Sequence, residues 1–319
     1  MRVLQLTNNY PTPKFPIFGI FGKEQIDSLN ELGVSNDVLF MNSREGGKLA
    51  YLTGYFRLIG KLLGNKYDLI HCHHSYSAII LVCTGAAFFK KCIVSYQNDP
   101  EHEGGKLLFR ILHGIFNGVI LKNKAPEIRY PRTYYLPNGV NTDFFKPYEK
   151  SYSKEKLGLD KNRRYIVFMD SYNQRTQKRI DRFWETMKIL KERYLFNDIE
   201  PLILTNTERS LMPFCLCASE LHLLTSDFEG SPNSVKECLA CNVPVVSTPV
   251  GNVAELIGDV RGCYISETFN PEELAELTSR VLNNSSHSSR EVIGAKGLDI
   301  KTVGQKLLSI YRNLINETK

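Results

Sequence analysis

The stretch "EGSPNSVKECLACNVPVVSTPVGNVAELI", residues 229–257, decides the fold of the C-terminal half of the chain. Its Gly-Ser-Pro turn precedes a segment with helical periodicity, and the buried-strand pattern "VPVVST" follows at residues 243–248. Ser231 is a good helix N-cap and Pro232 suits the first helical position, so we expect a helix from Pro232 to a stop before Pro244. A loop, a helix and a strand in succession are typical of an α/β protein.

Two glutamates eight positions apart, Glu229 and Glu237, frame the start of this expected helix. At about 100° per residue, Glu237 and Asn233 share the face opposite the apolar one. Glu229 lies beside the backbone amides of Gly230 and Ser231, and free amides at a helix start favour a phosphate or sugar oxygens. The pattern fits a cradle for a nucleotide sugar. A surface helix with a solvated Glu237, and a Glu229 that only complements the helix dipole, fits the spacing equally well.

The composition is that of a folded, globular protein. With 319 residues, 42% of them hydrophobic and 23% charged, the chain suits two domains of about 150 residues each. The longest nearly uncharged stretch, residues 77–89, is shorter than the roughly 20 residues of a membrane-spanning helix. The N-terminus does not resemble a secretory signal, so we expect a cytoplasmic protein with reduced cysteines. The net charge of +6 suits an anionic ligand, a membrane surface or nucleic acid equally.

Apolar runs of strand length recur between helix-like segments, in two groups. The runs are "RVLQLT", "NDVLFM", "YDLIHC", "KCIVSY" and "GVILK" in the first group, and "RYIVFMD", "EPLILT", "ELHLLTS" and "VPVVST" in the second. Continuously apolar runs predict parallel sheets covered on both faces. The charged segment at residues 136–164 separates the groups, so we expect domains at residues 1–150 and 151–300. Residues 301–319 are expected to form an amphipathic helix that packs back on the first domain.

With its flank, the stretch at residues 221–257 closely resembles the nucleotide-binding signature of retaining glycosyltransferase family 4, which has the GT-B fold. The resemblance implies two Rossmann-like domains with parallel sheets facing a central cleft. It also implies that Glu229 contacts the donor sugar and that Glu237 contacts the ribose hydroxyls. In "QKRIDRFWETMKIL", Lys178 matches the phosphate-binding lysine, and Arg175 is nearest to the family's arginine. The remaining donor-binding residues that the resemblance implies are Gly230, Ser231, Asn233 and Ser234.

Motifs of the N-terminal half extend the resemblance. Gly19 and Gly22 in "YPTPKFPIFGIFGKEQ" match the first loop and helix, where glycine allows the backbone to approach acceptor and phosphate. "YDLIHCHHSY" matches a strand that ends in histidine, and a ligand-facing, catalytic His73 is expected there. In "SYQNDPEHEG", Gln97 or Tyr96 stands at the family's histidine position, near Asp99. The chain also departs from the family after Lys178, where Arg179 replaces a glycine.

The resemblance implies transfer of a sugar from a UDP- or GDP-linked donor to a glycan or lipid-linked acceptor, with retention of anomeric configuration. Lys178 and the loop amides would stabilise the leaving diphosphate, which would help to deprotonate the acceptor hydroxyl. No Asp-x-Asp motif occurs, and "HCHH" and "CLAC" lack a second ligand pair at zinc spacing. We therefore expect neither a metal nor a cofactor, and no nucleic-acid partner. A GT-B nucleotide-sugar epimerase and a non-catalytic, membrane-associated binding module are the alternatives.

The stretch "REGGKLAYLTGYFRLIGKLLGNKY", residues 44–67, mixes cations with aliphatic and aromatic residues. The cations are Lys48, Arg57, Lys61 and Lys66. This composition suits a helix that lies on an anionic membrane. An ordinary helix packed on its own sheet fits it equally well. Membrane binding would indicate a lipid-linked acceptor in surface-polysaccharide assembly, on the cytoplasmic face of the membrane.

Overall fold

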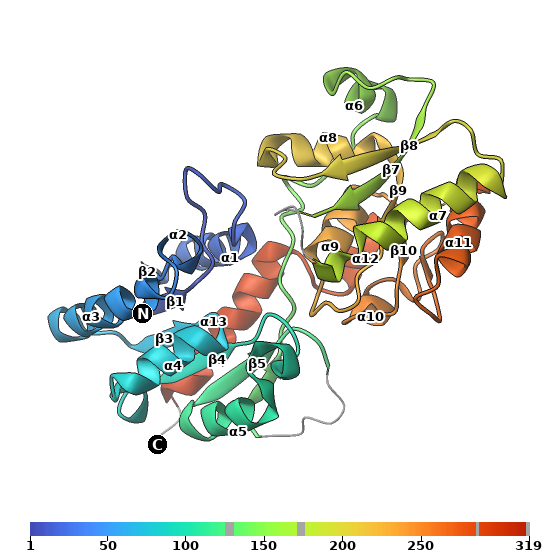
Figure 1. Ribbon diagram of the computed structural model, residues 1–319. Helices are drawn as coiled ribbons and strands as arrows, with labels where there is room; N and C mark the ends of the chain where they lie inside the picture. The colour runs from blue at the N-terminus through green and yellow to red at the C-terminus, as the bar shows by residue number, and fades with distance from the viewer. Residues whose placement is uncertain (125–130, 171–175, 285–286, 317–319) are drawn as a thin grey trace. The chain divides into compact units, whose positions relative to one another are not determined.

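The computed structural model describes residues 1–124, 131–170, 176–284 and 287–316, and it divides into two compact units (Figure 1). Unit 1 comprises Met1–Lys14, Phe18–Gly139 and the chain from Ile300, and unit 2 comprises Phe15–Ile17 and Val140–Asp299. The division falls at Gly139 and not at residue 150, because the segment that follows already packs into the second core. Val140 and Phe145 are both buried there.

Unit 1 is built on a six-stranded sheet in the order β2-β1-β3-β4-β5-β6, in which every pair is parallel. The strands are β1 (Arg2–Thr7), β2 (Ser35–Phe40), β3 (Leu69–Cys72), β4 (Cys92–Ser95), β5 (Gly118–Leu121) and β6 (Thr133–Tyr135). Residues alternate between two apolar layers, so that Leu4 and Ile70 face one core while Val3 and Leu69 face the other. Both faces of the sheet are therefore covered, as the apolar runs predict.

Helices cover both faces of the unit 1 sheet. They are α1 (Ile20–Glu31), α2 (Ser43–Gly46), α3 (Leu49–Gly64), α4 (Ser75–Cys83), α5 (Gly105–Ile115) and α13 (Ile300–Asn316), with the 3-10 turns η1 (Ala86–Phe88) and η2 (Pro100–Glu103). The C-terminal helix α13 packs against α1, and its buried Leu307 and Tyr311 share a core with Val3 and Leu69 of the sheet. The last helix of the chain thus belongs to the same unit as the first strand.

Unit 2 has a five-stranded parallel sheet in the order β11-β10-β9-β7-β8. The strands are β7 (Arg164–Met169), β8 (Ile199–Leu204), β9 (Ser219–Leu224), β10 (Val245–Ser247) and β11 (Tyr264–Ile265). The helices are α6 (Lys150–Lys156), α7 (Ile180–Glu192), α8 (Met212–Cys217), α9 (Asn233–Ala240), α10 (Val253–Ile257), α11 (Pro271–Asn283) and α12 (Arg290–Ala295), with the 3-10 turns η3 (Thr176–Lys178) and η4 (Arg209–Leu211). One face packs on α7 and α11, and the other packs on α8, α9, α10 and α12.

The α/β class with parallel sheets is confirmed, and each of the nine predicted strand runs contains a strand. The short edge strands β6 and β11 were not predicted, because two or three residues carry no readable periodicity. The eight cysteines are all free thiols, and seven of them are buried as small apolar side chains. No helix in the described part of the chain is long and apolar enough to cross a membrane.

Candidate functional site

The strand order of unit 2 places its candidate site at the carboxyl ends of β7 and β9. The chain passes from β7 to β8 on one side and then returns to add β9 on the other side. Such a switch point opens a crevice beyond the strand ends, where open α/β sheets bind their ligands. Ser226 and Glu229 follow β9, and Lys178 ends the 3-10 turn that follows β7.

Lys178 and Glu229, predicted separately as phosphate and sugar contacts, form an ion pair in the structure. The Lys178 Nζ donates to Glu229 Oε1 at 2.5 Å, and the two side chains are only 7% and 13% exposed. The hydroxyl of Ser226 donates to the same carboxylate oxygen at 2.8 Å. Little solvent screens the pair, so each partner holds the other in a defined orientation. A cation and a carboxylate thus stand side by side at the switch point.

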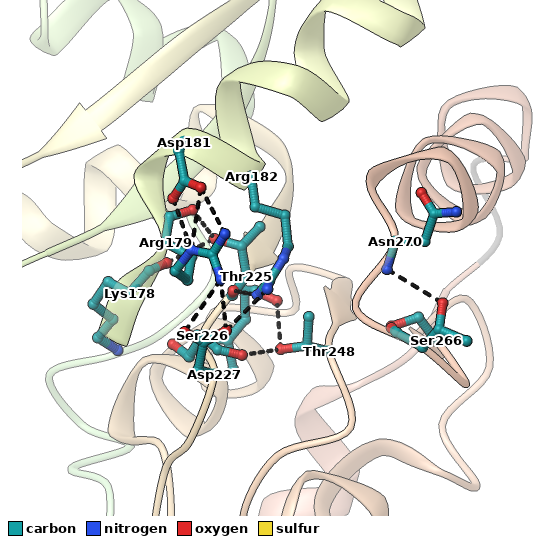
Figure 2. A network of polar contacts seen from close by, with 12 residues as sticks. Lys178, Arg179, Asp181, Arg182, Thr225, Ser226, Asp227, Thr248, Ser266 and Asn270 are labelled. Atoms are coloured by element: carbon teal, nitrogen blue, oxygen red, sulfur yellow. Dashed lines mark hydrogen bonds and ion pairs between the residues drawn. The ribbon is translucent and has the colours of Figure 1, made fainter. Parts of the chain in front are cut away.

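Arg179, which replaces the glycine of the resembled pattern, keeps the backbone conformation that favours glycine. Its φ of 51° and ψ of 58° lie in the left-handed region, where a side chain costs about 1 to 2 kcal/mol. The guanidinium pairs with Asp181 at 2.7 Å and with Asp227 at 3.1 Å, as Figure 2 shows. Arg182 also pairs with Asp227 at 2.9 Å and donates to the Thr225 carbonyl. These contacts fasten the end of β9 to the start of α7.

The turn before α9 is held by a close backbone approach and by a buried lysine. The helix begins at Asn233, so the predicted start at Pro232 and the predicted Ser231 cap are wrong. The Ser231 hydroxyl instead accepts from Lys236 Nζ at 3.0 Å, because that lysine is fully buried and needs an acceptor. Gly251 has a φ of 52°, and a Cβ there would lie 2.4 Å from the Gly230 oxygen. Only glycine permits the two loops to approach so closely.

Two backbone amides of this turn point to anion binding. The N–H groups of Gly230 and Ser231 donate no hydrogen bond within the described ranges. Asn233 Oδ1, at the first residue of α9, is buried and also lacks a partner there. The hydroxyl of Ser234 lies 3.2 Å from His222 Nε2, and burial lowers the pKa of His222 to about 4. A neutral His222 donates from Nδ1 to the Val167 carbonyl and so accepts at Nε2 from Ser234.

Glu237 lies outside the apolar core of α9, as predicted, yet it is only 8% exposed. Arg209 covers it, and the Nη1 atom donates to Glu237 Oε1 at 2.7 Å. The guanidinium lies 4.6 Å from the centroid of the Phe145 ring, which adds a cation–π contact. Sequence reasoning missed Arg209, because it precedes Glu237 by 28 positions and no local pattern links the two. Arg175 lies outside the described residues.

The predicted residues in the N-terminal half of the chain belong to unit 1. His73, after β3, is 6% exposed and donates from Nε2 to Gln5 Oε1 at 2.7 Å. Its ring stacks on His71 with centroids 4.0 Å apart, which confirms that both histidines point to the same side. Burial lowers the pKa of His73 to about 3, with a further contribution from the charge of Lys122. His73 is therefore neutral and part of a buried network.

The other predicted residues of unit 1 lie in loops, except Gly22, which lies in the first turn of α1. Gly19 has a φ of 67°, and a Cβ there would lie 2.4 Å from the Asn9 carbonyl, so this position requires glycine. A Cβ on Gly22 would meet nothing within 4 Å. The backbone N–H of Gln97 donates to Glu103 Oε1 at 2.6 Å, while its side-chain oxygen lacks a partner within the described ranges. Asp99 Oδ1 accepts from Asn123 Nδ2 at 2.5 Å.

Two units with parallel sheets, and a cation and carboxylates at the switch point of the second unit, are features of the GT-B class of glycosyltransferase folds. Residues 200–284, which include the turn, α9 and both glutamates, match the family model described as glycosyl transferases group 1. The solved structure of sucrose-phosphate synthase from Thermosynechococcus elongatus superposes with a TM-score of 0.77, at 13% identity and 98% coverage of both chains. This likeness shows the GT-B fold.

Two relatives in sequence have names that describe glycosyltransferases. A Bacillus subtilis protein named as a teichuronic acid biosynthesis glycosyltransferase is 23% identical, over 88% of this chain and 89% of its own. The UDP-Gal:alpha-D-GlcNAc-diphosphoundecaprenol alpha-1,3-galactosyltransferase of Escherichia coli is 25% identical, over 83% of this chain and 79% of its own. The family model over residues 200–284 and both relatives thus agree that this chain is similar to glycosyltransferases.

Proposed function

We propose that the protein transfers a sugar from a UDP- or GDP-linked donor to a glycan or lipid-linked acceptor, with retention of anomeric configuration. The observation that carries the proposal is the Lys178–Glu229 pair at 2.5 Å beside the amides of Gly230 and Ser231, which donate no hydrogen bond among the described residues. Cation and amides together suit a diphosphate, and the carboxylate beside them suits sugar hydroxyls. The names of both relatives support a polysaccharide or lipid-linked acceptor.

In the proposed reaction each residue acts on a different part of the donor. Lys178 and the loop amides bind the diphosphate and stabilise the charge that develops on it as the bond to the sugar breaks. Glu229 orients the sugar, and Glu237 accepts hydrogen bonds from the ribose. The leaving diphosphate takes the proton of the acceptor hydroxyl as the new glycosidic bond forms. The cationic charge of Lys178 serves the leaving group, so we propose that no metal ion is required.

One assay separates this reaction from its alternatives. The full-length protein is incubated with radiolabelled UDP- and GDP-sugars and a lipid acceptor extract, and the labelled products are separated. A labelled glycolipid or glycan whose anomeric proton signal matches the donor configuration would support the proposal. Conversion of the donor sugar without acceptor would indicate an epimerase, and binding without turnover would indicate a binding module. Either result would exclude the proposed transfer.

We also propose that unit 1 contacts an anionic membrane through α3, on the cytoplasmic side. The helix packs on its own sheet through buried Gly54 and Leu58. Its opposite side nevertheless leaves a row of apolar residues in solvent. The exposed fractions are 67% for Leu49, 55% for Leu52, 64% for Phe56 and 84% for Leu63. An apolar row of this kind beside cations is typical of helices that lie in a membrane interface.

Helices beside α3 also carry exposed apolar side chains. Helix α3 packs beside α4, and α4 beside α5, on one face of the unit 1 sheet (Figure 1). Further exposed apolar side chains stand after η1 and on α5, with Phe89 at 84% and Leu107 at 73% exposure.

The membrane contact can be tested with one variant and a matched control. Each cation near an anionic surface adds about 1 kcal/mol to the free energy of membrane binding. Sedimentation with phosphatidylserine vesicles should therefore fall strongly when glutamine replaces Lys48, Arg57, Lys61 and Lys66. Four equivalent replacements in unit 2, at Lys150, Lys156, Lys161 and Lys191, should leave sedimentation unchanged. Equal sedimentation of wild type and the unit 1 variant would exclude α3 as the membrane contact.

A further inference from the structure

The short segment that carries Lys178 is held in place by the residues that follow β9. The segment is the 3-10 turn η3 and the residue after it, and such a turn has few hydrogen bonds of its own. The backbone N–H of Asp227 donates to the Gln177 carbonyl at 2.8 Å. The buried hydroxyl of Thr225 donates to the Lys178 carbonyl at 2.8 Å and also lies 3.0 Å from the Arg179 carbonyl. Three successive carbonyls of the segment are therefore bound by one stretch after β9.

An ion pair with a buried arginine joins the same stretch to α7. Arg182, in the first turn of α7, has a side chain that is only 6% exposed. Its Nη2 donates to Asp227 Oδ1 at 2.9 Å, and its Nη1 donates to the Thr225 carbonyl at 2.5 Å. Figure 2 shows Arg179 and Arg182 both reaching Asp227. Asp227 is the carboxylate partner of Arg182 in the described ranges, so loss of the Asp227 charge would leave a buried cation uncompensated.

The segment that is held in this way ends in a strained residue. Arg179 has a φ of 51°, in the left-handed region. Its own side chain is 36% exposed and pairs with Asp181 as well as with Asp227, and exposed ion pairs of this kind stabilise little. A residue other than glycine keeps such a conformation only where its surroundings over-determine it, and this strain is concentrated at functional sites. The contacts of Thr225 and Asp227 with the segment supply that constraint.

The stretch after β9 also leads to Glu229, the partner of Lys178. The hydroxyl of Ser226 donates to Glu229 Oε1 at 2.8 Å, and the Ser226 carbonyl accepts from the hydroxyl of Thr248 at 2.7 Å. Lys178 and Glu229 are thus both fixed to residues 225–227, one through its backbone and the other through its side chain. Hydrogen bonds weaken steeply as their geometry departs from the optimum. A small displacement of residue 227 would therefore move the Lys178 ammonium away from its place at the switch point.

We propose that Asp227 and Arg182 are positioning residues for the contact between Lys178 and the donor diphosphate. The ion pair between them holds the turn η3, and the turn directs the Lys178 ammonium. Neither residue acts on the donor itself, since the guanidinium of Arg182 is buried and is bound to Thr225 and Asp227. This inference rests on the proposed function and deepens it by naming the residues that set the geometry of its phosphate contact.

The preference for a nucleoside diphosphate over its monophosphate reports on this contact. Calorimetric titration of the full-length protein measures Kd for UDP, UMP, GDP and GMP, and the base that binds more tightly is used throughout. The wild type should prefer the diphosphate, and Lys178→Met should lose most of that preference. Asp227→Asn should lower the preference about fivefold or more, while its affinity for the monophosphate changes little. A general loss of stability would weaken both nucleotides alike and would leave their ratio unchanged.

Two further variants and a control complete the test. Thr225→Val removes the hydroxyl that binds the Lys178 carbonyl, keeps the side-chain volume, and should also lower the preference. Arg182→Met combined with Asp227→Asn should lose less than the sum of the two single losses on a logarithmic scale, because the residues act as a pair. Asp198→Asn is the matched control and should keep the wild-type preference. Asp198 also pairs with an arginine in unit 2, at 2.6 Å, and is 45% exposed against 41% for Asp227.

Three results would overturn the positioning role: an undiminished preference in Asp227→Asn, an equal loss in Asp198→Asn, or additive losses in the double variant. If Arg182→Met or Thr225→Val no longer binds the monophosphate, that variant is not folded, and Asp227→Asn decides alone. Loss of monophosphate binding in Asp227→Asn as well would show that the pair maintains the fold instead, and would also overturn the role.

The titration requires no turnover, so it separates this inference from the proposed function. A wild type that prefers the diphosphate but transfers no sugar would exclude the proposed transfer and leave the comparison of variants standing. A wild type that transfers sugar while Asp227→Asn keeps the full preference would exclude the positioning role alone. A wild type without any preference for the diphosphate would overturn the inference.

Discussion

Replacing Glu237 with glutamine should weaken binding of the nucleoside diphosphate while it preserves the shape of the side chain. Oε1 of Glu237 already accepts from Arg209 at 2.7 Å, and Oε2 has no partner among the described residues. One carboxylate oxygen is thus left for the ribose. The side chain is 11% exposed, so water screens a hydrogen bond to it only weakly. Loss of one such charged bond should cost about 1.5 to 3 kcal/mol, or roughly 10- to 150-fold in Kd.

The assay is calorimetric titration with UDP and GDP, followed by the 2′-deoxy form of whichever nucleotide binds. The wild type should discriminate against the deoxy nucleotide, and Glu237→Gln should lose most of that discrimination, because ribose hydroxyl and carboxylate are partners. Glu220→Gln is the matched control, since Glu220 also forms a 2.7 Å ion pair in unit 2, with Lys150. Unchanged affinity of Glu237→Gln, or an equal loss in the control, would refute the ribose role.

Three further predictions concern turnover, metal and pH. Glu229→Gln should lower kcat of sugar transfer far more than it changes nucleotide Kd, and Lys178→Met should weaken both; a loss confined to Kd in Glu229→Gln would contradict its role. Transfer should persist in excess EDTA, whereas a loss that magnesium or manganese restores would contradict the metal-independent reaction. Because the pKa of His73 is lowered to about 3, stability should fall as pH drops below 6.5, by about 2 kcal/mol at pH 5 for this group alone. Thermal unfolding of wild type and His73→Gln from pH 8 to pH 5 measures it, and identical pH slopes would refute the assignment.

Local pattern predicted most of the fold because strand and helix periodicity depend on neighbouring residues. The runs from "RVLQLT" to "VPVVST" are strands, since continuous burial leaves a continuous apolar sequence. The start of α9 was predicted one residue early. Ser231 has a side chain that suits an N-cap. Its hydroxyl instead accepts a hydrogen bond from buried Lys236, whose ammonium group can only donate. A capping rule considers only the helix backbone and therefore could not foresee this competition.

The site was predicted in part. Glu229 and Lys178 were each identified from their own surroundings, yet the ion pair between them joins residues 51 positions apart. Arg209 beside Glu237, and Arg182 beside Asp227, were not predicted at all. Each of these pairs depends on which strands become neighbours. The periodicity of a single strand does not predict the order of strands in a sheet.

By itself, the sequence determined the α/β class, the strand runs and the positions of both glutamates, because hydrophobic period, turn chemistry and residue type act over a few residues. Only the tertiary structure decided that Arg179 takes a left-handed backbone beside two aspartates, and that Lys122 is buried. Those facts depend on packing between segments far apart in the chain. Burial and charge pairing at the ends of parallel strands, which set the chemistry of the candidate site, arise only when the sheets assemble.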